Sequence, residues 1–258
     1  MTPMMITLLI IAGAAILIAI GFLNNVVEAN KVTRTRTRHE LADRLRRLAD
    51  ITETFPGQLM APDLKLLLYR LELHMCKKLL PLDKSNPALK ERVPELEALV
   101  AQGDELEVSN APNPIQTEER AKQVSYQLEV IHHQLIRATQ EGMLGPGESR
   151  HWVGQIRHVL VLLHIEFFNN LGQQAFQEGE PGHARLAFER GVQYLKKQPE
   201  PSVYNEQLLY LEKLLARAND MVMNNIRHHQ DDASALTEGL AEETAEEKAE
   251  WKKRAIYD

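Results

Sequence analysis

Histidine is the residue type in this chain whose number and grouping could support metal binding or acid–base chemistry. Eight of the ten histidines form the candidate set: His132, His133, His151, His158, His164, His183, His228 and His229. His151 and His158 lie two turns apart on one face of a predicted helix, which is too far to share one ion directly, and His164 lies on another face. This spacing favours packed or surface histidines, and no metal site is expected.

His164 and Glu166 form a second candidate because they interrupt the apolar run VLLHIEFF. A charged side chain inside an apolar helix needs a partner, which Arg157 or Arg185 could supply. A structural ion pair is favoured over a catalytic acid here, since ion-pair networks alone often perturb such groups.

Sequence motifs of enzymes give no support for catalysis. The chain contains no GxxxxGK[ST], GxSxG, HExxH or paired CxxC pattern. The glycine-rich piece GMLGPGES at residues 142–149 lacks the lysine that reaches phosphates, so it is interpreted as a turn. We therefore expect neither enzymatic activity nor a cofactor.

The elements that carry these residues are predicted to be helical throughout. Leu, Ala, Glu, Gln, Arg and Lys dominate the 258 residues, and aromatic content is only 5%. Cys76 is the single cysteine, which excludes an internal disulfide and favours a reducing compartment. The expected fold class is all-α: a transmembrane helix followed by an antiparallel helical stack.

Residues 1–27 are predicted to be a membrane anchor, because residues 4–23 carry no charge and would span roughly 30 Å as a helix. The features of a cleavable signal peptide are missing. Bases follow the span, which predicts a single pass through the inner membrane with the N-terminus outside and the rest in the cytoplasm.

Residues 28–56 are predicted to be a basic juxtamembrane helix. Its bases nearest the span are Lys31, Arg34, Arg36 and Arg38. Either they bind anionic lipid headgroups, at about 1 kcal/mol for each base, or they serve only as a topology signal. Nucleic acid is not expected as a partner so close to a bilayer.

Residues 57–230 are predicted to form the cytoplasmic helical domain. FPG at residues 55–57 ends the juxtamembrane helix, and Pro62 opens the next one. Asn86 and Pro87 are expected to start a further helix, which Pro94 interrupts and restarts as a short helix. Residues 103–116 are expected to be an exposed loop.

In two stretches, apolar residues recur at alternating spacings of four and three, which predicts two helices that each pack along one seam. The two series are Val124, Leu128, Ile131, Leu135 and Ala138, and then Tyr204, Leu208, Leu211, Leu215, Ala218 and Val222. Between them, VLVLLHIEFF at residues 159–168 is apolar almost all round and predicts the central helix.

The stretch NLGQQAFQEGEPGHARLAFERG at residues 170–191 predicts two short helices folded back on each other. The tetratricopeptide pattern is met by Phe168, Leu171, Gly172, Ala175, Gly179, Ala184, Phe188 and Gly191. No comparable match lies thirty-four residues away on either side. The hairpin is therefore expected to stack against helices that are not repeats.

Residues 231–258 are predicted to be a disordered acidic tail, with nine acids against four bases. Its end, EWKKRAIYD, differs because Trp251, Ile256 and Tyr257 provide apolar anchors around three bases. A short docking segment has this composition, and its target is either the chain's own helical stack or another protein.

Across its length the chain resembles a bacterial family of single-pass membrane-anchored helical proteins with a tetratricopeptide-like hairpin. The stretches that carry the resemblance are FPGQLMAPDLKLLLYRLEL, LLPLDKSNP, HWVGQIRHVLVLLHIEFFNNLGQQAF, ARLAFERGVQYLKKQPEP and WKKRAIYD. The label "DNA repair ATPase" that some members carry implies a nucleotide-dependent activity, but this chain lacks a phosphate-binding loop. No active-site residue follows from the resemblance.

The sequence as a whole predicts a membrane-anchored scaffold that recruits a cytoplasmic or membrane protein. Asn169, Asn170, Gln173 and Gln177 would line the groove of the hairpin and bond an extended peptide, or would merely solvate the helix. The alternatives are a nucleotide-dependent DNA-processing factor and a homo-oligomer that pairs its seams between chains.

Overall fold

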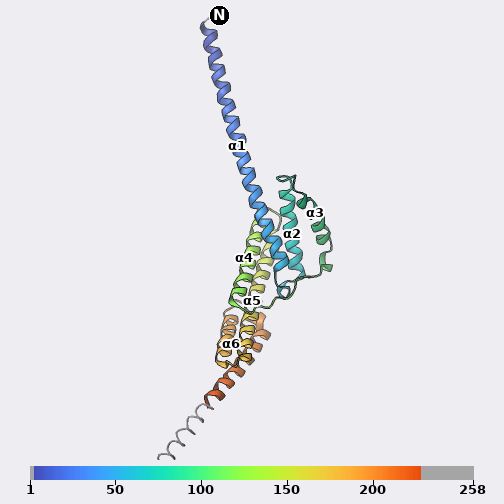
Figure 1. Ribbon diagram of the computed structural model, residues 1–258, viewed down its shortest axis with the longest axis vertical. Coiled ribbons are helices and arrows are strands. Elements are labelled where there is room, and N and C mark those ends of the chain that lie inside the picture. The colour runs from blue at the N-terminus through green and yellow to red at the C-terminus, as the bar shows by residue number, and fades with distance from the viewer. Residues whose placement is uncertain (1–2, 228–258) are drawn as a thin grey trace, which may run out of the picture. The chain divides into compact units, whose positions relative to one another are not determined.

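The computed structural model describes residues 3–227, and it describes side chains from Gly21 onward except those of residues 23 and 26. Every regular element in this range is a helix (Figure 1). The helices are α1 (Pro3–Thr54), α2 (Pro62–Leu79), α3 (Pro87–Ala101), α4 (Glu118–Gln140), α5 (Pro146–Gln177), α6 (Pro181–Lys196) and a last helix over residues 205–227. The all-α prediction is thereby confirmed for the described residues.

The predicted anchor coincides with the first part of α1. Within the residues whose side chains are described, no helix offers an apolar stretch long enough for a membrane span. The predicted span, residues 4–23, lies almost entirely outside that range. The acidic tail, with Trp251, Ile256 and Tyr257, also lies outside the described residues.

The helix that was predicted to continue beyond the anchor is part of α1 itself. Its three threonines satisfy their hydroxyl groups within the helix, each donating to the carbonyl four residues earlier, as Thr33 Oγ1 does to Ala29 O over 2.9 Å. The FPG stretch ends the helix at Thr54, as expected.

The chain divides into two compact units, and each is described by itself. The first contains residues 1–113 and 126–156, and the second contains residues 114–125 and 157–258. In the first unit α2 lies beside α1, and α3 lies beside α2 (Figure 1). The core between these helices is formed by Leu41, Tyr69, Cys76, Leu79, Leu89, Leu96 and Leu106.

The residues around Pro94 differ from the prediction. Instead of a restart, α3 runs without a break from Pro87 through Pro94 to Ala101. A proline inside a helix removes the hydrogen bond to the carbonyl four residues earlier. Pro94 is exposed, so water can satisfy the Lys90 carbonyl that is left over. Asn86 caps the start of α3 as predicted, since its Oδ1 accepts from Ala88 N over 3.1 Å.

The segment predicted as an exposed loop is anchored more firmly than its composition indicates. Leu106 is buried in the first unit and Ile115 is buried in the second. Asn110 Nδ2 donates to the carbonyls of Thr52 and Phe55, each over 3.0 Å, at the end of α1. A polar residue of the loop thus caps a helix that is far away in the sequence.

Lys65 of α2 holds the same loop residue from the other side. Its ammonium group is buried, and it donates to Asn110 Oδ1 over 2.7 Å and to Ser109 Oγ over 2.9 Å. Gly57 completes the arrangement, because a Cβ there would lie 2.1 Å from Asn110 O. The glycine of FPG is therefore needed for a close backbone approach and not only as a helix stop.

A second charged cluster joins α1, α2 and the end of α4. The carboxylate of Glu141 contacts Lys78 Nζ at 2.6 Å, Arg44 Nη1 at 3.3 Å and His74 Nε2 at 3.3 Å. Burial alone would raise the pKa of Glu141, but Lys78 and Arg44 outweigh it and hold this pKa below the ordinary value. The cluster fixes three helices of the first unit together.

The second unit is built around the hairpin of α5 and α6. Its buried core includes Ala184, Phe188 and Leu195 of α6, together with Leu211 and Ala218 of the last helix. A Cβ at Gly172 would lie 2.4 Å from the ring of Phe188, so α5 and α6 approach closely at that point. Gly191 is similarly close to Phe168 and Leu211. The small and aromatic positions that were predicted to face each other therefore do so.

Candidate partner-binding surface

The turn between α5 and α6 creates the shape of the candidate site. α5 ends at Gln177, and Gly179 adopts a positive φ of 75°, a conformation that glycine reaches without strain. Glu180 N then donates to Ala175 O over 2.9 Å, which closes the end of α5. Pro181 starts α6 at a position where the missing N–H costs nothing. The chain therefore reverses within three residues.

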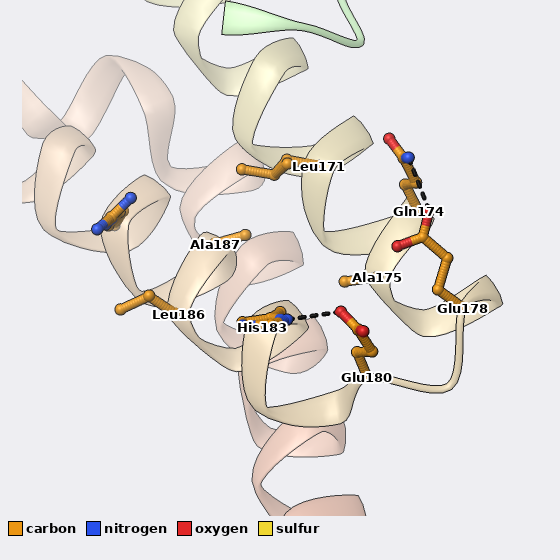
Figure 2. A pocket seen from close by; sticks show the side chains of 9 residues that line it. Leu171, Gln174, Ala175, Glu178, Glu180, His183, Leu186 and Ala187 are labelled. Carbon is orange, nitrogen blue, oxygen red and sulfur yellow. Dashed lines mark hydrogen bonds and ion pairs between the residues drawn. The ribbon is translucent and has the colours of Figure 1, made fainter.

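One hollow lies along this turn, with a volume of about 290 Å³. We call it the hairpin hollow; it is lined by Leu171, Gln174, Ala175, Glu178, Glu180, His183, Leu186, Ala187 and Arg190. Figure 2 shows Leu171 and Ala175 on α5, with Leu186 and Ala187 on α6. Its apolar surface includes Leu186, which is 43% exposed, whereas Leu195 on the core side of the same helix is buried. The hollow thus offers an apolar patch to a ligand.

Four polar side chains of the hairpin hollow form two pairs (Figure 2). Gln174 Nε2 donates to Glu178 Oε1 over 2.8 Å, and His183 Nδ1 lies 2.6 Å from Glu180 Oε2. Glu178 follows the end of α5 and Glu180 is the N-cap of α6, so both carboxylates lie at the turn. This end of the hollow is acidic.

Arg190 is the basic residue that lines the same hollow. Its charge also acts on Glu118 at the start of α4, because Lys122 and, to a lesser degree, Arg190 lower the pKa of the Glu118 carboxyl. Glu118 is itself paired with Lys122 over 2.7 Å, so Arg190 keeps its charge at the hollow, where Glu178 and Glu180 outnumber it.

A second hollow, of about 590 Å³, lies on the polar side of α5. We call it the amide hollow; it is lined by Pro114, Gln116, Asn170, Gln173, Gln174, Gln177 and Glu178. Five of these residues carry a side-chain amide, which offers both a donor and an acceptor. The two hollows share Gln174 and Glu178 and are therefore neighbours.

The structure brings together three of the four hairpin residues proposed from the sequence. Asn170, Gln173 and Gln177 line the amide hollow, whereas Asn169 does not. The Oδ1 atom of Asn169 is buried and makes no hydrogen bond within the described chain. Asn170 also has a structural role, since its Nδ2 donates to Ile115 O over 3.1 Å and so positions Pro114 and Gln116.

Sequence reasoning missed the contribution of the loop before α4 and of α6. Pro114 and Gln116 belong to a segment interpreted only as an exposed loop. One sequence feature could have predicted that Leu186 lies at the surface: it falls on the face of α6 opposite the small residues of the tetratricopeptide pattern. Nothing in the spacing along the chain indicates that residues near 115 reach α5.

The other candidate residues have ordinary structural partners. Glu166 Oε1 accepts from Ile115 N over 3.0 Å. The His164 ring stacks on Tyr194 and its Nδ1 lies 2.7 Å from Leu160 O, whereas the His158 ring stacks on Tyr204. Within the described residues, no three His, Cys, Asp or Glu side chains gather as a metal site would require.

The basic residues of α1 are mostly accessible. Lys31, Arg34 and Arg36 are exposed and Arg38 is half-buried. Arg34 Nη2 donates to Pro81 O over 3.0 Å, at the turn that follows α2. Lipid binding by these residues stays a prediction.

Comparison with protein-family models, with curated proteins and with solved structures gave no match for this chain.

Proposed function

We propose that the protein is a scaffold, anchored in the inner membrane by residues 1–27, that recruits a partner protein through its tetratricopeptide-like hairpin in the cytoplasm. The observation that carries this proposal is the amide hollow. Asn170, Gln173 and Gln177 stand one or two turns apart on α5, and Gln116 faces them from the loop before α4. An extended peptide presents alternating backbone donors and acceptors, and a row of amides can bond both.

The size and openness to solvent of this surface agree with peptide binding. A hollow of about 590 Å³ falls within the usual range of roughly 300–1,000 Å³ for ligand sites. Gln177 is exposed and Gln173 is half-buried, so both side chains can exchange water for a peptide without disturbing the core. Tetratricopeptide-like hairpins that stack on other helices present such surfaces on their first helix.

Affinity capture from solubilised membranes tests the proposal, with the full chain as bait. Gln173→Ala combined with Gln177→Ala removes four hydrogen-bonding groups from the amide hollow and none from the core. Gln155→Ala is the matched control, because Gln155 is an exposed glutamine of the same helix outside the hollow. We expect the double variant to lose partners that the wild type and the control retain, and an unchanged set of partners would refute the proposal.

Self-association through the seams is not proposed. All five seam residues of α4 are buried within the chain. In the second series Tyr204, Leu211 and Ala218 are buried, whereas Leu208, Leu215 and Val222 are half-buried. The expectation of a nucleotide-dependent activity is tested by calorimetry with ATP, where saturable micromolar binding would argue against a purely structural role.

A further inference from the structure

We propose that the hairpin hollow is the docking site of the chain's own segment Glu250–Asp258, which competes with a recruited partner for the acidic end of the hairpin. The proposal rests on the proposed function of this hairpin as a peptide-binding surface. Four observations carry it: the charge of the hollow, its apolar patch, the position of the last helix, and the length of chain that follows.

The charges of the two surfaces are complementary. Glu178 and Glu180 line the hairpin hollow at the turn, where two carboxylates stand against the one guanidinium of Arg190. The segment EWKKRAIYD carries Lys252, Lys253 and Arg254 in succession. Its three bases outnumber its two acids, Glu250 and Asp258, so the segment is attracted to this end of the hairpin, whereas the acidic residues 231–249 that precede it are not.

The apolar parts of the two surfaces also match. Leu186 is 43% exposed, and with Leu171, Ala175 and Ala187 it forms the apolar side of a hollow of about 290 Å³. Trp251 directly precedes the three bases, so an indole placed on this patch would bring the bases close to the carboxylates. An aromatic anchor surrounded by charge is the usual composition of a binding hot spot.

The last helix passes the turn between α5 and α6, on the core side of the hairpin. The guanidinium of Arg217 lies 5.5 Å from the centre of the Phe176 ring, at the end of α5 next to the turn. Residue 227 is ten positions further, which is about 15 Å along a helix. Phe176 packs on Phe188 and does not line the hollow, so the segment must pass around the turn to reach it.

The connecting chain is long enough to return. Residues 228–249 number 22, and they would span up to about 75 Å if extended, or about 25 Å root-mean-square as a flexible coil. Both lengths exceed the roughly 15 Å by which residue 227 lies beyond Arg217 along the last helix, so the segment can return to the turn. A tether of this length gives an effective local concentration in the millimolar range, so even a weak contact is occupied within one molecule.

Docking in the hairpin hollow has a consequence for recruitment. Gln174 and Glu178 belong to both hollows, so a docked segment covers part of the surface proposed for the partner. The segment would then lower the apparent affinity for the partner, and removing it would raise the amount of partner captured.

Tryptophan fluorescence of the full chain tests the docking directly. Trp152 and Trp251 are the only two tryptophans, so Trp152→Phe leaves Trp251 as the single reporter. We expect a blue-shifted emission that is protected from iodide and independent of protein concentration. In Leu186→Asp the docking equilibrium should fall by about tenfold, and the emission should move toward that of a synthetic Glu250–Asp258 peptide in water.

Leu209→Asp is the matched control, because Leu209 is an exposed leucine of the same unit that lies outside the hollow, at 58% against 43% for Leu186. It should leave the emission unchanged. The proposal is overturned if Trp251 emits like the free peptide, if a blue shift persists in Leu186→Asp, or if the shift grows with protein concentration, which would indicate docking between two copies.

A second measurement separates this proposal from the proposed function. A fluorophore-labelled Glu250–Asp258 peptide should bind the chain that lacks residues 250–258 and bind the full chain at least tenfold more weakly. If the labelled peptide binds both chains equally, or binds neither, self-docking is contradicted. The proposal that Gln173 and Gln177 bind a partner is not affected by that result. The opposite outcome is also distinct. If Gln173→Ala with Gln177→Ala leaves the captured partners unchanged while the labelled peptide still binds the shortened chain, only the proposed recruitment is refuted.

Discussion

Gly172 of α5 faces the ring of Phe188 of α6 so closely that an added Cβ would lie 2.4 Å from two ring carbons. Phe188 is fully buried, and the hairpin closes over this contact. The close approach of these two residues sets the spacing of α5 and α6 and hence the position of the hairpin hollow between them.

Substitution of Gly172 by alanine should therefore destabilise the second unit. Overpacking of a close contact costs about 1–3 kcal/mol, which corresponds to a fall in melting temperature of roughly 2–12 °C for a chain of this size. Gly154→Ala is the control on the same helix, because a Cβ at Gly154 meets nothing within 4 Å. Thermal unfolding followed by circular dichroism compares them, and equal melting temperatures would contradict the close approach.

Asn110→Ala should destabilise the first unit more than its position in a loop indicates. The substitution removes the donor to the carbonyls of Thr52 and Phe55 and leaves the buried ammonium of Lys65 with one partner fewer. The expected cost is about 2–4 kcal/mol, since a charged group loses a buried hydrogen bond. Asn113→Ala in the same loop serves as control, because the contacts of Asn113 use its backbone. Chemical denaturation would measure both, and a similar loss in the two variants would argue against the cap.

Cys76 should resist alkylation in the folded protein. Its side chain is buried, and burial raises the pKa of the thiol to about 11 from an ordinary value of 9.0. The thiolate fraction near pH 8 falls by about a hundredfold for a shift of two units, before the steric barrier is counted. A maleimide assay on the wild type and on Ser202→Cys, whose position is exposed, would compare the rates. Equal labelling of the two thiols in the native state would refute the prediction.

Stability should fall in alkaline solution, and Tyr69 should contribute to that loss. Burial raises the pKa of Tyr69 to about 12 from 10.0. The unfolded chain therefore releases this proton first, so the stabilisation is complete below pH 10 and is lost as the pH rises toward 12. Urea unfolding at pH 8 and pH 10.5 should show a smaller decrease for Tyr69→Phe than for the wild type. An identical decrease in both would show that Tyr69 titrates normally.

Glu141 should contribute stability that is lost in acid. Its folded pKa lies below the ordinary value of 4.5, so the stabilisation is present above pH 4.5 and disappears as the pH falls through the folded pKa. Glu141→Gln removes this dependence and leaves Arg44 without its buried counter-charge. The variant should be less stable than the wild type at pH 7 and nearly equal to it below pH 3. Denaturant midpoints at the two pH values check this, with Glu178→Gln as an exposed-carboxylate control.

The order and limits of most helices could be predicted from the sequence because they depend on local chemistry. Pro62 begins α2 and Asn86 caps α3, since a proline or a cap acts within one helical turn. The seam of α4 from Val124 to Ala138 is buried as its spacing predicts, because a helix that repeats apolar residues every three to four positions has one face to bury. The continuous helix through Pro94 was not predicted, because the exposure that makes an internal proline tolerable depends on how α3 packs.

The binding surface depends on contacts that no local pattern contains. The polar row of Asn170, Gln173 and Gln177 is visible in the sequence, because residues three and four apart share a helical face. Its partner Gln116 comes from a loop that Asn170 holds through Ile115, about fifty-five residues earlier in the chain. The reason is physical: a sequence specifies which faces of its helices must be covered, but which segment covers them is decided by the packing of residues that are distant along the chain.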